Sequence, residues 1–253
     1  MLRAEKVSLS FGGVHAVVEV DIDVHEREIY AIIGPNGAGK TSFFNALSGF
    51  YYPDAGRVWF KDDEITRMPN YSRIARGMSR TFQTPSIFPE LTVYENVVLG
   101  VHSKLDIAGS LRGLSRAHRQ ETQTRVDELL GFVRLERWKD TQVASLSHGS
   151  QRLVEIAACL SVSPTLVLLD EPTAGLAEAD TARVMEVVRD LRDRLGLTVV
   201  FVEHNMRFVS TLADTVMVMD RGRVLLRGGP KEVLNDHRVR EAYLGAEEET
   251  ADV

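Results

Sequence analysis

The segment GPNGAGKT, residues 34–41, constrains this chain more than any other feature. The run EIYAII (Glu28–Ile33) before it predicts a short buried strand, and SFFNALSG after it predicts a helix closed by Gly49. A Gly-x-x-x-x-Gly-Lys-Thr loop between a strand and a helix is typical of phosphate binding, because glycines let backbone N–H groups turn toward phosphate oxygens. The alternative is a glycine-rich turn with no ligand.

The residue types in this loop match the chemistry of a polyphosphate. Lys40 is predicted to place a positive charge on the β- and γ-phosphates, and the Thr41 hydroxyl is placed to bind Mg²⁺. The helix that begins here adds the positive end of its dipole. The predicted nucleotide-binding residues are Gly34, Pro35, Asn36, Gly37, Ala38, Gly39, Lys40, Thr41 and Ser42.

A second candidate site lies in LVLLDEP, where a predicted buried strand ends in two acids. A carboxylate at a strand end beside a phosphate loop is the expected second Mg²⁺ ligand, a role that we assign to Asp170. Glu171, one residue further on, is the candidate base that polarises a water for attack on the γ-phosphate. Taken alone, the two acids could instead cap the junction between strand and loop.

The order of predicted elements indicates an α/β fold. After Gly149, strands alternate with amphipathic helices, which predicts a mostly parallel sheet. The first 24 residues suggest a β-hairpin around Gly12-Gly13, and helical stretches replace strands from Met68 to about Asp140. The basic stretch Lys104–Arg119 is interpreted as a solvated helical insertion, with a binding patch as the alternative.

Composition narrows the class of protein. The chain has 253 residues, 44% hydrophobic and 26% charged, as in an ordinary globular protein. Its net charge of -6 argues against a large basic face for nucleic acid. The segment MLRAEKVSLSF lacks a signal-peptide core, and no run of about 18 apolar residues predicts a membrane span, so any work at a membrane would depend on partners. A lone cysteine, Cys159, excludes an internal disulfide.

The stretch SHGSQRL (Ser147–Leu153) admits two interpretations. Two serines and a histidine within four positions suggest a hydrolase, but the strand–turn setting of a Gly-x-Ser-x-Gly nucleophile is missing. Because an apolar helix follows, the stretch also reads as a helix N-terminus that presents N–H groups and the Ser147 hydroxyl to an anion.

Taken together, the phosphate loop, RTFQ, LSHGSQ, LLDEP and VEH resemble, in that order, the motifs of ATP-binding-cassette (ABC) ATPase subunits. The resemblance implies a P-loop NTPase core with a mostly parallel sheet, an antiparallel β subdomain and an α-helical subdomain. On this basis we expect a single domain over residues 1–253. The core and β subdomain would take residues 1–82 and 165–240, the helical subdomain about 83–160, and a flexible acidic tail 246–253.

The resemblance also implies roles for single residues. Gln83 would contact Mg²⁺ and the attacking water, His204 would touch the γ-phosphate, and Phe11 would stack on adenine; the alternatives are a surface loop, a capping histidine and core packing. A signature motif would act on ATP held by a second subunit, through Ser147, His148, Gly149, Ser150 and Gln151. His148 stands where the family often has tyrosine, and Ala177 where it often has aspartate or asparagine.

Longer runs, including RTFQTPSIFPELTVYENVVLG and the ending VREAYLG, resemble the ATP-binding subunit of importers for branched-chain amino acids, which have relatives for urea and short amides. This resemblance implies an ATPase that uses ATP and Mg²⁺ at the cytoplasmic face of the membrane. Its expected partners are a second ATPase subunit, identical or homologous, transmembrane permease subunits and, indirectly, an external solute-binding protein, with no nucleic acid. Residues 83–95 are the expected coupling surface. The alternatives are the ATPase of a lipopolysaccharide-type exporter, a cassette ATPase not linked to transport, and a nucleotide-binding regulator without turnover.

Overall fold

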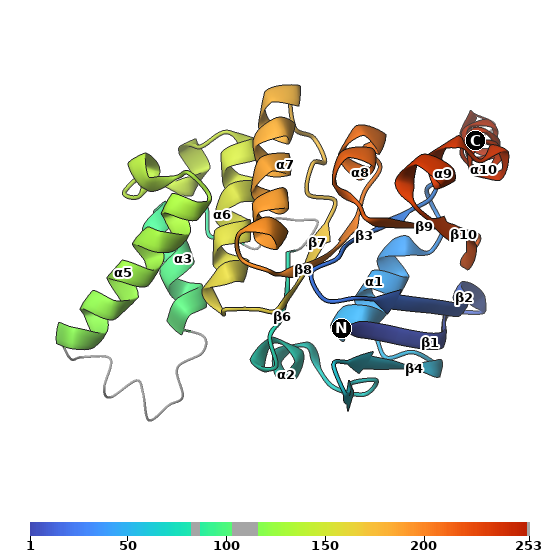
Figure 1. Cartoon of the computed structure of the whole chain (residues 1–253), viewed down its shortest axis with the longest axis horizontal. Coiled ribbons are helices and arrows are strands. Elements are labelled where there is room, and N and C mark those ends of the chain that lie inside the picture. Colours follow the sequence, from blue (N-terminus) through green and yellow to red (C-terminus); the bar gives the residue numbers. More distant parts are fainter. Residues whose placement is uncertain (82–86, 103–115, 252–253) are drawn as a thin grey trace.

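The computed structural model describes residues 1–81, 87–102 and 116–251, and its strands form two sheets (Figure 1). The larger sheet has the order β10-β9-β3-β8-β7-β6. Its neighbours pair in parallel from β9 to β6, and β10 closes the other edge antiparallel to β9. These observations confirm the predicted α/β class with parallel central strands. The strands are β3 (Ile29–Ile33), β6 (Met78–Arg80), β7 (Leu166–Asp170), β8 (Thr198–Val202), β9 (Thr215–Asp220) and β10 (Arg223–Gly228).

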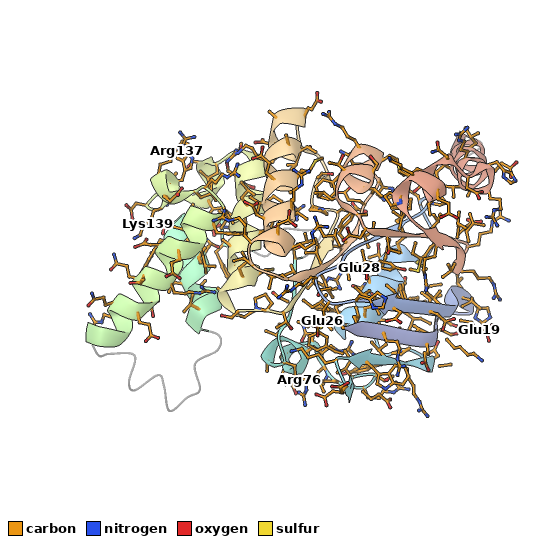
Figure 2. The ribbon with its side chains drawn as sticks, viewed as in Figure 1. Glu19, Glu26, Glu28, Arg76, Arg137 and Lys139 are labelled. Carbon is orange, nitrogen blue, oxygen red and sulfur yellow. The ribbon has the colours of Figure 1, made fainter. Side chains whose placement is uncertain are left out.

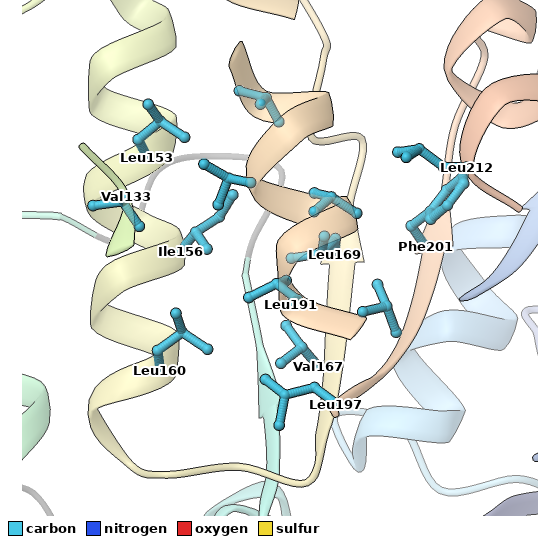
Figure 3. Packing of buried hydrophobic residues seen from close by; sticks show 14 of the residues in the cluster. Val133, Leu153, Ile156, Leu160, Val167, Leu169, Leu191, Leu197, Phe201 and Leu212 are labelled. Carbon is cyan, nitrogen blue, oxygen red and sulfur yellow. The ribbon is translucent and has the colours of Figure 1, made fainter. Parts of the chain in front are cut away.

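Apart from Thr198 and Asp170 at strand ends, the central strands β3, β7 and β8 are apolar, because both faces of the sheet are covered. In β3, Ala31 and Ile33 pack with one cluster of buried side chains, while Tyr30 and Ile32 pack with the other. The first cluster joins the sheet to α6 (His148–Ser161), α7 (Glu178–Asp193) and α8 (Met206–Leu212), as Figure 3 shows. The second joins it to α1 (Lys40–Ser48).

The second sheet is antiparallel and has the order β2-β1-β4-β5. Its strands are β1 (Leu2–Phe11), β2 (Val14–Val24), β4 (Ala55–Phe60) and β5 (Asp63–Glu64), and the predicted Gly12-Gly13 turn joins the first two. Buried side chains from this sheet pack against α1 in the same cluster as Phe43 and Phe44. Helix α1, which follows the phosphate loop, is therefore enclosed between the two sheets.

Helices dominate the middle of the chain, as predicted, with one exception. Helices α3 (Val93–His102) and α5 (Arg116–Phe132) pack with α6 into one group (Figure 1), and the short α2 (Asn70–Ala75) lies beside β6. The sequence suggested helices in place of strands from Met68 to about Asp140, but Met78–Arg80 form the edge strand β6, paired with β7. Three residues are too few to show a strand periodicity, so the sequence pattern could not reveal β6 and the prediction was wrong at this strand. Most of the basic stretch 104–119 lies outside the described residues.

The last described elements are the β9–β10 hairpin around Arg221-Gly222, then α9 (Pro230–Asn235) and α10 (His237–Ala251). The limits of the core and helical subdomain stay predictions, as does the flexible tail at 246–253, although α10 extends as far as Ala251. No helix within the described ranges combines the length and the apolar composition that crossing a membrane requires.

Candidate functional site

The phosphate loop lies at the carboxyl end of β3, pressed between two other strands. A Cβ atom added to Gly34 would lie 2.1 Å from the Met219 carbonyl oxygen of β9, and one added to Gly39 would lie 2.2 Å from the Ala16 carbonyl oxygen of β2. Gly39 also has φ 92 where it caps α1. Any side chain at these two positions would push the loop off the strands, so the tertiary packing explains both glycines.

Lys40, the first residue of α1, folds back over the loop that precedes it. Its Nζ donates hydrogen bonds of 2.8 Å to the carbonyl oxygens of both Gly34 and Pro35. Burial lowers the pKa of Lys40 to about 8, and the nearby Glu171 carboxylate opposes that shift. A partly desolvated ammonium next to the loop is suited to an anionic ligand, because attraction to the ligand's negative charge would compensate for the lost solvation.

Asp170, at the end of β7, is held in a buried ion pair that the sequence did not predict. Arg80, the last residue of β6, donates a 2.6 Å hydrogen bond to Asp170 Oδ2, and the side chains are 8% and 2% exposed. Arg80 also donates to Asn45 Oδ1 and Ser48 Oγ of α1, at 2.6 and 2.5 Å. Burial raises the pKa of Asp170, while the Arg80 guanidinium opposes the rise. Arg80 therefore ties the strand end to the helix of the phosphate loop.

Glu171 and His204 meet across the ends of β7 and β8. His204 Nε2 lies 3.2 Å from Glu171 Oε1, with the histidine side chain 40% exposed and the glutamate 17%. Glu171 adopts φ 46, a left-handed conformation that costs a non-glycine residue about 1–3 kcal/mol, and its backbone N–H donates to the Val202 carbonyl. The structure thus brings together two predicted catalytic residues that are 33 positions apart in the numbering, and Glu171 interacts electrostatically with Lys40.

Phe11, the predicted adenine-stacking residue, ends β1 and has an exposed ring. Its ring meets the Tyr51 ring edge-on, with centroids 5.1 Å apart and an interplanar angle of 69°. Tyr51 lies just beyond α1 and was not singled out from the sequence, because nothing in the spacing links it to Phe11. An exposed ring supported at its edge is a suitable platform for a base, whereas a ring in core packing would be buried.

The SHGSQRL stretch forms the predicted helix N-terminus. Ser147 caps α6 by accepting a 3.3 Å hydrogen bond from the Ser150 N–H, and Gln151 Nε2 donates to the carbonyls of Val143 and Leu146, both at 3.2 Å. His148 is exposed on the first turn. On its other side the turn faces α7, since Arg183 contacts both Ser150 and Asp180. These contacts place the turn against α7 and the preceding loop of its own chain.

Asp170 and Thr41 provide the oxygen ligands that Mg²⁺ prefers, a carboxylate and a hydroxyl. Thr41 is exposed on the first turn of α1, and Asp170 ends β7 with one carboxylate oxygen held by Arg80. The donor set therefore fits the predicted ion. Gln83, the third predicted ligand, lies outside the described residues.

Comparison with protein families places most of the chain in one known group. Residues 17–174 match the family described as ABC transporter, and residues 223–249 match one described as branched-chain amino acid ATP-binding cassette transporter.

Curated relatives align along nearly the whole chain. The high-affinity branched-chain amino acid transport ATP-binding protein LivG of Salmonella typhimurium is 36% identical over 250 residues, covering 97% of this chain and 98% of LivG. BraF of Pseudomonas aeruginosa, with the same description, is 34% identical over 97% and 98% of the two chains. The lipopolysaccharide export system ATP-binding protein LptB of Acidithiobacillus ferridurans is 35% identical over 97% of each chain.

Solved structures agree with these matches. The ADP conformation of an ATP-binding cassette of an ABC transporter superposes with a TM-score of 0.86 at 32% identity, covering 97% of this chain and 98% of the other. A dimeric ATP-binding cassette in a post-hydrolysis state, bound to ADP and Pi, gives a TM-score of 0.78 at 25% identity over 91% and 99% of the two chains.

Proposed function

This chain belongs to the ABC transporter family, and on that premise we propose that it is the ATP-hydrolysing subunit of an importer for branched-chain amino acids or a related small polar solute. The observation that carries the proposal is the Glu171–His204 contact of 3.2 Å, in which Glu171 also interacts electrostatically with Lys40. A nucleotide-binding regulator without turnover would not need this pair, in which Glu171 has a strained backbone.

The proposed chemistry assigns one task to each group. Lys40 and the loop N–H groups hold the β- and γ-phosphates, and the Phe11 ring stacks on adenine. Glu171 accepts a proton from the attacking water, and His204 contacts the γ-phosphate and keeps the Glu171 carboxylate in place. Mg²⁺, held by Thr41 and Asp170, with Gln83 proposed as a third ligand, would neutralise charge on the phosphates.

A second subunit would complete each site. The N-terminus of α6, with Ser147, Gly149 and Ser150, presents N–H groups and a hydroxyl suited to the γ-phosphate bound by the partner. His148 and Gln151 would then lie at the same interface. The dimeric cassette among the similar structures supports this arrangement. Closure of two such subunits on ATP, and reopening after hydrolysis, would drive the membrane partners.

A hollow between α2, β6, α3 and α6 suits the contact with a permease. Its lining includes the apolar side chains Phe50, Ile74 and Ile87; the first two are exposed and Ile87 is half-buried. It adjoins residues 87–95 of the predicted coupling surface. We propose that the chain lies at the cytoplasmic face of the membrane, bound to permease subunits. An external solute-binding protein would deliver the solute to these permease subunits.

Phosphate release by the wild type and by Glu171→Gln tests the ATPase proposal, alone and with the membrane partners. We expect the variant to lose at least about a hundredfold in kcat. If the wild type released no more phosphate than the variant under both conditions, the ATPase proposal would be wrong.

The LptB relative, at 35% identity, keeps a lipopolysaccharide exporter as the second candidate. The match at residues 223–249 favours the importer. Proteoliposomes with the permeases and solute-binding protein encoded beside this chain decide between them. ATP-dependent uptake of labelled leucine would support the amino acid importer, and uptake of urea alone would indicate the related solutes. Lipopolysaccharide release without uptake would support the exporter.

A further inference from the structure

Glu203, which follows β8, is a buried carboxylate shared between two loops. Its side chain is 2% exposed. Oε1 accepts hydrogen bonds from the backbone N–H and the hydroxyl of Thr173, at 2.7 and 2.6 Å. Oε2 accepts from the backbone N–H groups of His204 and Asn205, at 2.9 and 3.1 Å. Each carboxylate oxygen therefore accepts hydrogen bonds from a different loop.

The two loops carry the two proposed catalytic side chains. Thr173 lies two positions after Glu171, and His204 directly follows Glu203. The side chains of Glu171 and His204 meet on one side, and Glu203 joins their backbones on the other, so the contacts close a ring. A residue with φ 46 keeps that conformation only when its surroundings impose it. The bond to Thr173 is one of the constraints that can do so.

We propose that Glu203 is a positioning residue that sets the distance and orientation between Glu171 and His204, an inference that rests on the proposed ATPase function. Glu203 acts through the two loops, since its own oxygens are occupied by four donors. A carboxylate is suited to this task because both of its oxygens only accept, whereas an amide would turn one NH₂ group toward backbone N–H donors. Loss of the link would let the two catalytic side chains move apart by up to about 1 Å.

The Glu203→Gln substitution tests this proposal with little change in volume. We expect kcat for ATP hydrolysis to fall by about tenfold to hundredfold, because a misplacement of about 1 Å in a reacting constellation has that effect. The KM for ATP should change by less than about twofold, since Lys40 and the phosphate loop are untouched. Thr173→Val, which removes only the hydroxyl donor, should give a smaller loss in the same direction, and Thr173→Ser should retain activity.

Combining Glu203→Gln with His204→Ala distinguishes the proposed positioning role of Glu203 from a purely structural role. If Glu203 acts by positioning the pair, Glu203→Gln should change kcat by less than about twofold in the His204→Ala background. A structural role would give the same fold loss in both backgrounds. The matched control is Glu28→Gln (Figure 2). Glu28 is also buried, and it accepts a 2.7 Å hydrogen bond from the backbone N–H of His25. It precedes β3 and so lies at the opposite end of this strand from the phosphate loop. This control should leave kcat unchanged.

Four results would overturn the inference. An active wild type with an equally active Glu203→Gln would overturn it alone, and so would equal fold losses in the two backgrounds. A wild type without turnover would overturn the proposed function and this inference with it. If Glu203→Gln did not fold, as judged by circular dichroism, Thr173→Val with unchanged kcat would decide against the proposal.

Discussion

The buried ion pair between Arg80 and Asp170 predicts a large and specific stability effect for Arg80→Met. Methionine fills a similar volume but leaves the Asp170 carboxylate, 2% exposed, without the guanidinium 2.6 Å away. It also removes the donor to Asn45 and Ser48, so the link from β6 to α1 is lost.

The magnitude follows from the burial of both partners. Removing one member of a buried ion pair costs about 3–5 kcal/mol in the free energy of unfolding, because an uncompensated charge remains. For a chain of this size each kcal/mol lowers Tm by about 2–4 °C, so Tm should fall by about 6–20 °C. Replacing both partners, as in Arg80→Met with Asp170→Leu, removes the buried charge and should restore at least half of the loss.

The stability deficit should also depend on pH. Burial already raises the pKa of Asp170, and removing Arg80 removes the group that opposes the rise. The folded variant therefore keeps the Asp170 proton to a higher pH than the unfolded chain does. Its deficit should be small near the unfolded pKa of about 4, grow as pH rises toward the folded pKa, and level off above it. Unfolding at pH 5 should show a smaller deficit than at pH 8.

Urea unfolding followed by circular dichroism measures these differences. The matched control is Arg76→Met (Figure 2), which breaks the exposed Arg76–Asp63 pair and should cost less than about 1 kcal/mol. If Arg80→Met cost no more than this control, or if the double variant were less stable than the single one, the reasoning from buried charge would be refuted.

Three further predictions concern other parts of the molecule. Burial lowers the pKa of Lys40 to about 8, and bound phosphates would favour its charged form. ATP affinity should therefore fall by up to about tenfold per pH unit above pH 8, and should not depend on the protonation of Lys40 below about pH 7. Titration with a fluorescent ATP analogue would measure this dependence, and the same slope in Lys40→Arg would contradict the prediction. In Gly149→Ala the new Cβ would lie 2.2 Å from Asp180 Cγ, so ATP-dependent dimerisation in a Glu171→Gln background should weaken. Gel filtration would measure this, and adding Asp180→Gly should restore dimerisation. Normal dimerisation of Gly149→Ala without Asp180→Gly would disprove the steric argument. Burial raises the pKa of Cys159 to about 12, so the native protein should not react with a disulfide reagent at pH 8, whereas the denatured chain should react at its single thiol; rapid labelling of the folded protein would show that the thiol is accessible.

Local sequence patterns were sufficient for the fold class and for much of the candidate site. The phosphate loop, the strand ending in Asp170 and Glu171, and the helix after Ser147 are each contiguous, and their chemistry is set by residues within a few positions. A contiguous motif needs no knowledge of distant contacts, so the α/β class and the parallel sheet were predicted correctly. The short strand β6 was missed because its three residues derive their structure from pairing with β7.

Only the tertiary structure decided which side chains support these motifs. Arg80 and Asp170 are 90 positions apart, Thr173 and Glu203 are 30 apart, and the Phe11 ring meets that of Tyr51 from another element. The first two pairs form where parallel strands end at a common edge of the larger sheet, and that adjacency depends on strand order, which no single stretch of sequence contains. The sequence by itself determined which groups perform the proposed chemistry, and the fold decided which buried partners hold those groups in place.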